Sequence, residues 1–94
     1  MPIETHPFDA AAVLDTPEAI EEYLADAFET DDPKFISHAL GVVARAKGMS
    51  QLSEETGLAR PALYRALSTE GNPEFSTILK VAHALGFRLS PQRM

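Results

Sequence analysis

The chain has 94 residues and a mass of 10.2 kDa, which is room for one small domain. It contains no cysteine, so disulfide-stapled scaffolds and cysteine-based zinc modules are excluded, and a reducing, cytoplasmic location is expected. Its apolar runs are far shorter than the ~20 residues of a membrane span, and we see no signal peptide.

The charge is divided unevenly along the chain. The whole carries 14 acids and 8 bases, a net of −6. Residues 1–33 hold ten of the acids and no Lys or Arg (−10), whereas residues 34–94 hold all eight bases and four acids (+4). Such asymmetry indicates two surfaces with different partners, although acids on a helix can also simply keep it hydrated.

The first strong helix signal covers residues 17–29. Thr16 can cap this helix and Pro17 fits its first position. An amphipathic stripe follows at the spacing that places side chains on one helical face. The stripe of this helix consists of Ile20, Tyr23, Leu24, Ala27 and Phe28.

Upstream of this helix, we expect an extended arm at residues 1–7 and one helical turn at residues 8–14, capped by Asp9.

A second helix is predicted between Asp32-Pro33, which repeats the start signal, and Gly48, which ends it. A short helix at 51–56, capped by Ser50, and another at 61–67 follow. The apolar stripe of the second helix consists of Phe35, Ile36, Ala39, Leu40, Val43 and Ala46.

The last helix is predicted from Asn72-Pro73 to residue 85, before Gly86. Residues 87–89 alternate apolar and polar, which is typical of a short strand. The predicted fold class is therefore all-α with five helices. We expect an acidic arm and helix at 1–33, a helix-turn-helix domain at 34–89 and a tail at 90–94. The buried face of the last helix consists of Phe75, Ile78, Leu79, Ala82 and Leu85.

Residues 49–67 have the spacing of a helix-turn-helix. Gly57 supplies the positive φ that the turn needs, and Ser53 is small enough for a close helix crossing. Ala59 departs from the pattern, because such turns often have a capping Ser or Thr there. With Leu52, Leu58 and Leu63 facing inward, other side chains must face outward. The candidate DNA-contacting residues are Ser50, Gln51, Arg60, Pro61, Tyr64, Arg65 and Ser68.

Several segments of the chain resemble the small addiction-module antidote (antitoxin) proteins related to the HigA type. The two longest are Ala39–Leu52 and Thr56–Ser68, and the shorter ones are Gly71–Val81, Ala84–Gly86, Pro7–Asp9 and Pro17–Ile20. The resemblance spans about residues 7–89. It implies a lambda-repressor/Xre-type DNA-binding domain that binds operator DNA as a homodimer and represses its own operon. It also implies a small basic toxin of the RelE/ParE superfamily as partner.

A cationic toxin would need an acidic surface on its antidote. We therefore expect the acids of the first helix to bind it: Glu18, Glu21, Glu22, Asp26 and Glu29.

Other readings stay open. The chain could be a stand-alone Xre-type repressor without a toxin, or an adaptor whose helix-turn-helix no longer reads DNA. An enzyme is disfavoured, because no nucleophile, base and orienting group fall into a known pattern. The three histidines, His6, His38 and His83, are far apart in the sequence, and none lies at the spacing from an acidic residue that metal ligands typically have. We therefore expect no metal and no cofactor. Gly41 inside a helix indicates a close helix crossing, since glycine there costs ~1 kcal/mol relative to Ala.

Overall fold

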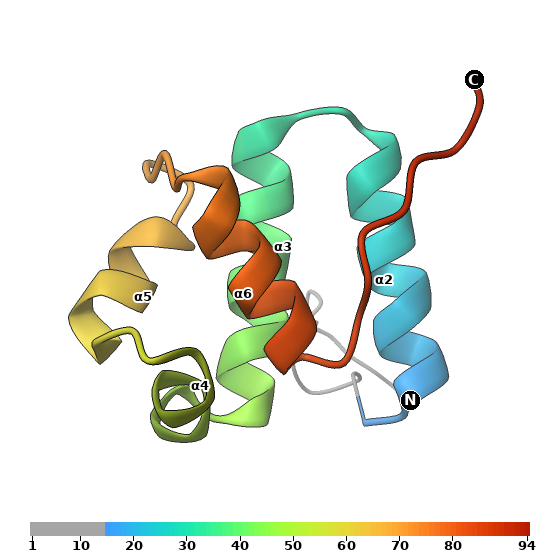
Figure 1. The fold of residues 1–94 in the computed structure, drawn as a ribbon. Helices are drawn as coiled ribbons and strands as arrows, with labels where there is room; N and C mark the ends of the chain where they lie inside the picture. Colours follow the sequence, from blue (N-terminus) through green and yellow to red (C-terminus); the bar gives the residue numbers. More distant parts are fainter. Residues whose placement is uncertain (1–14) are drawn as a thin grey trace, which may run out of the picture.

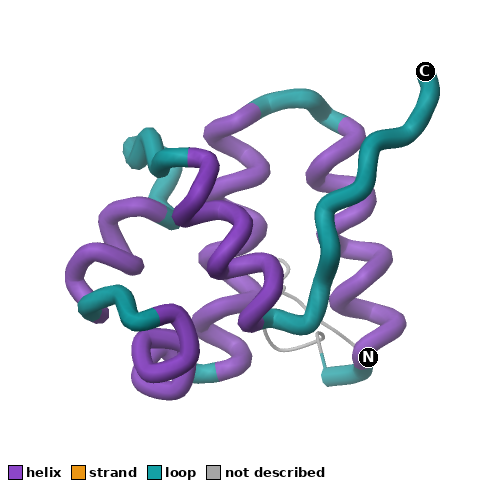
Figure 2. Tube along the Cα trace, viewed as in Figure 1, coloured by secondary structure: helices purple, strands orange, loops and turns teal. Residues whose placement is uncertain are grey.

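The computed structural model describes residues 15–94, which form five α-helices and no strand (Figures 1 and 2). This confirms the all-α prediction. The arm and helical turn predicted upstream of residue 15 lie outside the described residues. None of the helices in residues 15–94 is long and apolar enough to cross a membrane. The helices are α2 (Pro17–Glu29), α3 (Pro33–Lys47), α4 (Met49–Thr56), α5 (Arg60–Ala66) and α6 (Phe75–Ala84).

Local capping places the starts of α2 and α3 where the sequence predicts them. The Thr16 hydroxyl accepts a hydrogen bond from the Ala19 N–H at 3.1 Å. The Asp32 carboxylate accepts from the N–H groups of Lys34 and Phe35 at 3.0 and 3.4 Å. In each helix proline occupies the first position, where its missing N–H costs no hydrogen bond.

Two predicted caps were wrong. Gly48 alone separates α3 from α4, so α4 begins at Met49 and Ser50 lies inside its first turn. No side chain caps that end, because the capping position is the glycine itself. Likewise α6 begins at Phe75 after Glu74 rather than at Asn72, and its first N–H groups have no side-chain acceptor.

The central helix of the fold is α3, which is buried along its middle on every side. It packs against α2 on one face and against α4 and α6 on others (Figure 1). The amphipathic stripe predicted for it was therefore too narrow, because every residue from Ser37 to Ala44 is buried except His38, which is half-buried. The first and last residues of the predicted stripe, Phe35 and Ala46, lie outside the core and are exposed. The fully buried larger side chains are Leu40, Leu52, Leu63, Leu67 and Val81.

A close approach between α3 and the end of α5 occurs at Gly41, as predicted. A Cβ built on Gly41 would lie 2.5 Å from the Leu67 carbonyl oxygen and 3.3 Å from the Leu67 Cβ. Leu67 is the residue that ends α5 and is almost completely buried. The absence of a side chain at Gly41 thus lets the end of α5 rest directly on α3.

The predicted strand at residues 87–89 was wrong. Gly86, with φ +93°, turns the chain so that the Phe87 N–H bonds the Ala82 carbonyl at 2.8 Å, a left-handed helix cap. The alternation is real, since Phe87 and Leu89 are half-buried and Arg88 is exposed. In residues 15–94, however, no second strand pairs with this segment, which lies as an irregular tail after α6 (Figure 2).

The buried face predicted for α6 was partly wrong. Val81 and Ala82 are its buried residues, and Ile78 packs beside them. Phe75, assigned to that face by its spacing, is 69% exposed. As the first residue of the helix, Phe75 lies beyond the edge of the core that the following turns cover.

Candidate nucleic-acid interface

Two short helices, α4 and α5, meet through the three-residue turn 57–59. Gly57 adopts φ +77°, a left-handed conformation that suits glycine. The Ser53 hydroxyl donates to the Leu58 carbonyl at 2.6 Å and ties the end of α4 to the turn. The Thr56 hydroxyl accepts from the Leu58 N–H at 3.2 Å. The positive φ predicted for Gly57 is therefore confirmed, whereas Ser53, chosen for its small size, contributes a hydrogen bond that the sequence analysis did not predict.

The inner side of this pair is apolar and fixes what can face outward. Leu52 and Leu63 are fully buried, and Leu58 packs partly against the same core. Because α5 has only seven residues, burying one face leaves the opposite edge in solvent. Ala59, where a hydroxyl cap is missing, makes no side-chain hydrogen bond to α5, as its residue type predicts.

The outward edge of α5 carries the residues expected there. Arg60, Pro61 and Arg65 are exposed, and Tyr64 is 43% exposed. Within residues 15–94 neither arginine forms an ion pair, so no described carboxylate neutralises them. Ser68 is half-buried, and its hydroxyl donates to the Arg65 carbonyl at 3.0 Å. That hydroxyl therefore closes the end of α5 in this structure.

Ser50 and Gln51 are exposed in the first turn of α4. The Gln51 amide donates to the Glu55 carboxylate at 3.2 Å, one helical turn further on. Both side chains thus lie at the exposed start of α4. The backbone N–H groups of a first helical turn have no partner within the helix, and such groups favour an anion.

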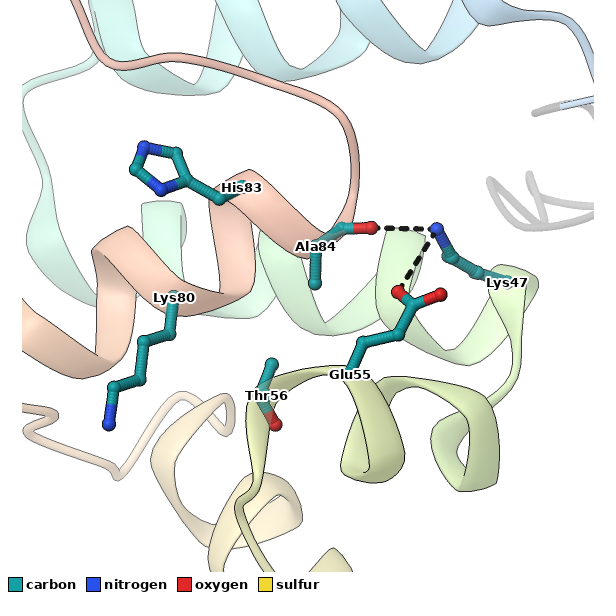
Figure 3. A pocket seen from close by; sticks show the side chains of 6 residues that line it. All are labelled: Lys47, Glu55, Thr56, Lys80, His83 and Ala84. Atoms are coloured by element: carbon teal, nitrogen blue, oxygen red, sulfur yellow. Dashed lines mark hydrogen bonds and ion pairs between the residues drawn. The ribbon is translucent and has the colours of Figure 1, made fainter.

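A contact that the sequence could not predict holds the ends of three helices together. The Lys47 ammonium donates to the Ala84 carbonyl at 2.7 Å and lies 3.6 Å from a Glu55 carboxylate oxygen (Figure 3). It thus joins α3, α4 and α6 beside an open depression of about 580 Å³. Lys80 and His83 also line the depression, but they point away from the ion pair (Figure 3).

The acidic surface predicted on the first helix is exposed. All five of its carboxylates lie in solvent on α2, and none pairs with a cation in the described part of the chain. On the inner side of α2, burial raises the pKa of the Tyr23 hydroxyl, and the Arg45 guanidinium opposes that shift. Among residues 15–94 no three His, Asp or Glu side chains gather as metal ligands do. The five acids are Glu18, Glu21, Glu22, Asp26 and Glu29.

Comparison with known proteins decides the family. Residues 4–93 match the model of a family described as "Probable addiction module antidote protein". The chain belongs to this family. It is also similar to an uncharacterized protein of Haemophilus influenzae, with 42% identity over 86 residues that cover 92% of this chain and 89% of that protein. No solved structure matches it.

Membership of the antidote family bears on the two candidate surfaces differently. An antidote of an addiction module has a toxin as its partner, which gives the acidic face of α2 a candidate ligand. The family description names no nucleic acid, so the outward edge of α5 stays a predicted DNA contact.

Proposed function

We propose that this antidote is the antitoxin of a type II module that neutralises a basic RelE/ParE-superfamily toxin and represses its own operon by binding DNA. The observation that carries the proposal is the separation of charge between two exposed surfaces. One is the acidic outer face of α2 and the other is the arginine-bearing edge of α5. The chain then works as a binding protein with two ligands of opposite charge.

In the DNA-binding role, α4 and α5 act as a helix-turn-helix of the Xre type. The exposed edge of α5 enters the major groove, where an arginine can form two hydrogen bonds with guanine. The first turn of α4, with Ser50 and Gln51, contacts a phosphate. The two guanidinium groups, Arg60 and Arg65, have no described acidic partner, so no intramolecular ion pair has to break. One unit reads only a few base pairs, so a homodimer binds a two-fold operator.

A gel-shift titration on the chain's own promoter at fixed salt tests this role. Arg65→Ala should lower operator affinity by roughly 5–150-fold, because one bidentate arginine–guanine contact provides ~1–3 kcal/mol of discrimination. Arg88→Ala is the matched control, since it removes another exposed arginine outside the proposed interface. The circular dichroism spectrum should be unchanged in both. Wild-type affinity for Arg65→Ala would refute the assignment.

In the toxin-binding role, the acids of α2 attract and hold a cationic surface. Carboxylates at positions i and i+4 of a helix, such as Glu18 and Glu22, repel one another, and no described cation relieves that repulsion. A basic partner supplies the missing countercharge and speeds association through long-range attraction.

The product of the neighbouring reading frame is the toxin to test. Replacing Glu18, Glu21 and Glu22 together by Ser should weaken its binding and reduce the salt dependence of the association rate. The control removes the same charge elsewhere, from three exposed acids outside α2. Equal losses in both triple variants, or none in either, would exclude the α2 surface. The control acids are Glu54, Glu70 and Glu74.

A further inference from the structure

The two arginines on the outward edge of α5 lie in parts of the helix that are held differently. Arg65 lies between Leu63 and Leu67, whose side chains are 0% and 1% exposed. Arg60 is the first residue of α5, and no side chain caps that end. Before it, Leu58 packs only partly against the core. The backbone that carries Arg65 is therefore anchored in the core on both sides, and the backbone that carries Arg60 is anchored less firmly.

The loop between α5 and α6 (Figure 1) bonds to the carbonyl of Arg65. The Ser68 hydroxyl donates to this oxygen at 3.0 Å, and the Ser68 N–H donates to it at 3.5 Å. The Gly71 N–H donates to the Ser68 carbonyl at 3.1 Å and closes a turn over residues 68–71. Ser68 is thus the residue that joins this turn to the last turn of α5.

Three successive carbonyls at the end of α5 each lie against a glycine. A Cβ on Gly71 would collide with the Arg65 carbonyl and lie 2.7 Å from the Ala66 oxygen. A Cβ on Gly41 would lie 2.5 Å from the Leu67 oxygen. Neither glycine has a positive φ, so both positions need glycine for space rather than for backbone conformation. The 68–71 turn and α3 therefore both pack closely on this end of α5.

The hydroxyl of Ser68 has a single proton, and the Arg65 carbonyl accepts it in this structure. The phosphate oxygens of DNA only accept hydrogen bonds, so a contact from Ser68 to a phosphate needs the same proton. In one rotamer, Ser68 can therefore bond the Arg65 carbonyl or a phosphate, but not both. Its half-buried position at the 68–71 turn favours the first.

A contact with a base edge demands more of the protein than a contact with a phosphate. Two parallel hydrogen bonds to guanine fix both distance and direction, so the supporting residues must hold the side chain within about 0.5 Å. A phosphate presents several oxygens and needs mainly a positive charge within reach. We propose that Ser68 is a positioning residue that holds Arg65 for base reading, while Arg60 binds a phosphate. This role rests on the proposed DNA-binding function and gives each arginine a separate task.

A double-mutant cycle on the chain's own promoter tests whether Ser68 acts through Arg65. In gel shifts at fixed salt, Ser68→Ala should lower operator affinity roughly fivefold, the equivalent of one lost hydrogen bond. The same loss should persist in the Arg60→Ala background and shrink below about twofold in the Arg65→Ala background. A general loss of folded protein would instead lower affinity equally in both backgrounds. Ser68→Thr keeps the hydroxyl and should bind like the wild type.

Alanine variants of the two arginines separate their tasks, because each variant removes one exposed positive charge. Arg65→Ala should lower affinity for the operator by roughly 5–150-fold and affinity for a random duplex much less. Arg60→Ala should weaken binding to both duplexes by the same factor and reduce the slope of log affinity against log salt by about 1. The reverse pattern, or the same pattern in both variants, would overturn the proposal.

The wild-type chain separates a failure of the Ser68 role from a failure of the proposed function. If the wild type binds its promoter no tighter than a random duplex, DNA-binding repression fails and the role of Ser68 falls with it. If wild-type binding is specific, but Ser68→Ala has no effect or loses the same factor in both arginine backgrounds, only the role of Ser68 is overturned.

Discussion

Replacing Gly41 by Ala sets two opposing effects against each other. In an exposed helix the change stabilises by ~1 kcal/mol, because Ala has the higher helix propensity. Here the new Cβ would lie 2.5 Å from the Leu67 carbonyl oxygen, where ordinary contacts are 3.4–4 Å, so the backbone at the end of α5 must move by about 1 Å.

The contact should outweigh the propensity. Overpacking of a filled interior typically costs 1–3 kcal/mol, and a backbone atom cannot rotate away as a side chain can. We place the cost near the top of that range, since Leu67 is almost fully buried and ends α5. Subtracting the propensity gain leaves a net destabilisation of about 1–2 kcal/mol.

Urea unfolding followed by circular dichroism measures the difference. Ala46→Gly, at an exposed position of the same helix, measures the local value of helix propensity and should destabilise by ~1 kcal/mol. Adding that value to the loss in Gly41→Ala gives the energy of the contact alone. If Gly41→Ala were as stable as the wild type or more so, α5 would not rest on α3 as described. Because Leu67 ends α5, a true displacement should also weaken operator binding.

Two further predictions concern the turn and the acidic helix. Ser53→Ala should destabilise by ~1–3 kcal/mol in urea unfolding, because it leaves the half-buried Leu58 carbonyl without its donor; no loss would mean that water replaces the hydroxyl. Glu22→Gln should stabilise by roughly 0.4–1 kcal/mol, because it removes repulsion with Glu18 and Asp26 one turn away on either side. The melting temperature should rise with added NaCl in the wild type and rise less in Glu22→Gln; equal salt slopes would refute the repulsion.

The starts of α2 and α3 were predictable because their determinants are local. A capping side chain, a proline and an acidic or amphipathic turn lie within a few residues, and tertiary packing does not have to be known. The predictions that Ser50 and Asn72 cap helices were wrong, because a residue type that can cap a helix does not cap one wherever it occurs. Gly48 occupies the joint before α4, so Ser50 is already helical.

Features that depend on the assembled core could not be predicted. The Lys47–Ala84 contact joins residues 37 positions apart, and its acceptor is a backbone carbonyl that no residue type marks. Helical spacing placed Phe75 on the buried face of the last helix, but Phe75 is exposed. Spacing shows which residues share a face of a helix, and it does not show how far along the helix the core extends. The outward edge of α5 was predictable. In a helix of only seven residues, the apolar side chain that faces the core fixes the buried side, and the polar side chains must then face solvent on the opposite side.

The position of the acids on α2 helps to separate a binding surface from a merely hydrated one. The N-terminal end of a helix favours negative charge and the C-terminal end disfavours it. Asp26 and Glu29 lie in the last turn of α2, where the structure places no basic residue of that helix. Hydration alone would be served as well by lysine or glutamine at these positions, without the unfavourable interaction with the helix dipole.

This reasoning predicts a trade between stability and binding. Changing Asp26 and Glu29 to Gln should raise the melting temperature, because it removes charge that the end of the helix disfavours. The same double variant should bind the toxin more weakly, with a smaller dependence on salt. A matched pair at exposed acids outside α2, Glu54→Gln with Glu70→Gln, should leave toxin binding unchanged. If the α2 pair gained stability and kept full affinity, its acids would serve hydration, and the toxin would bind elsewhere.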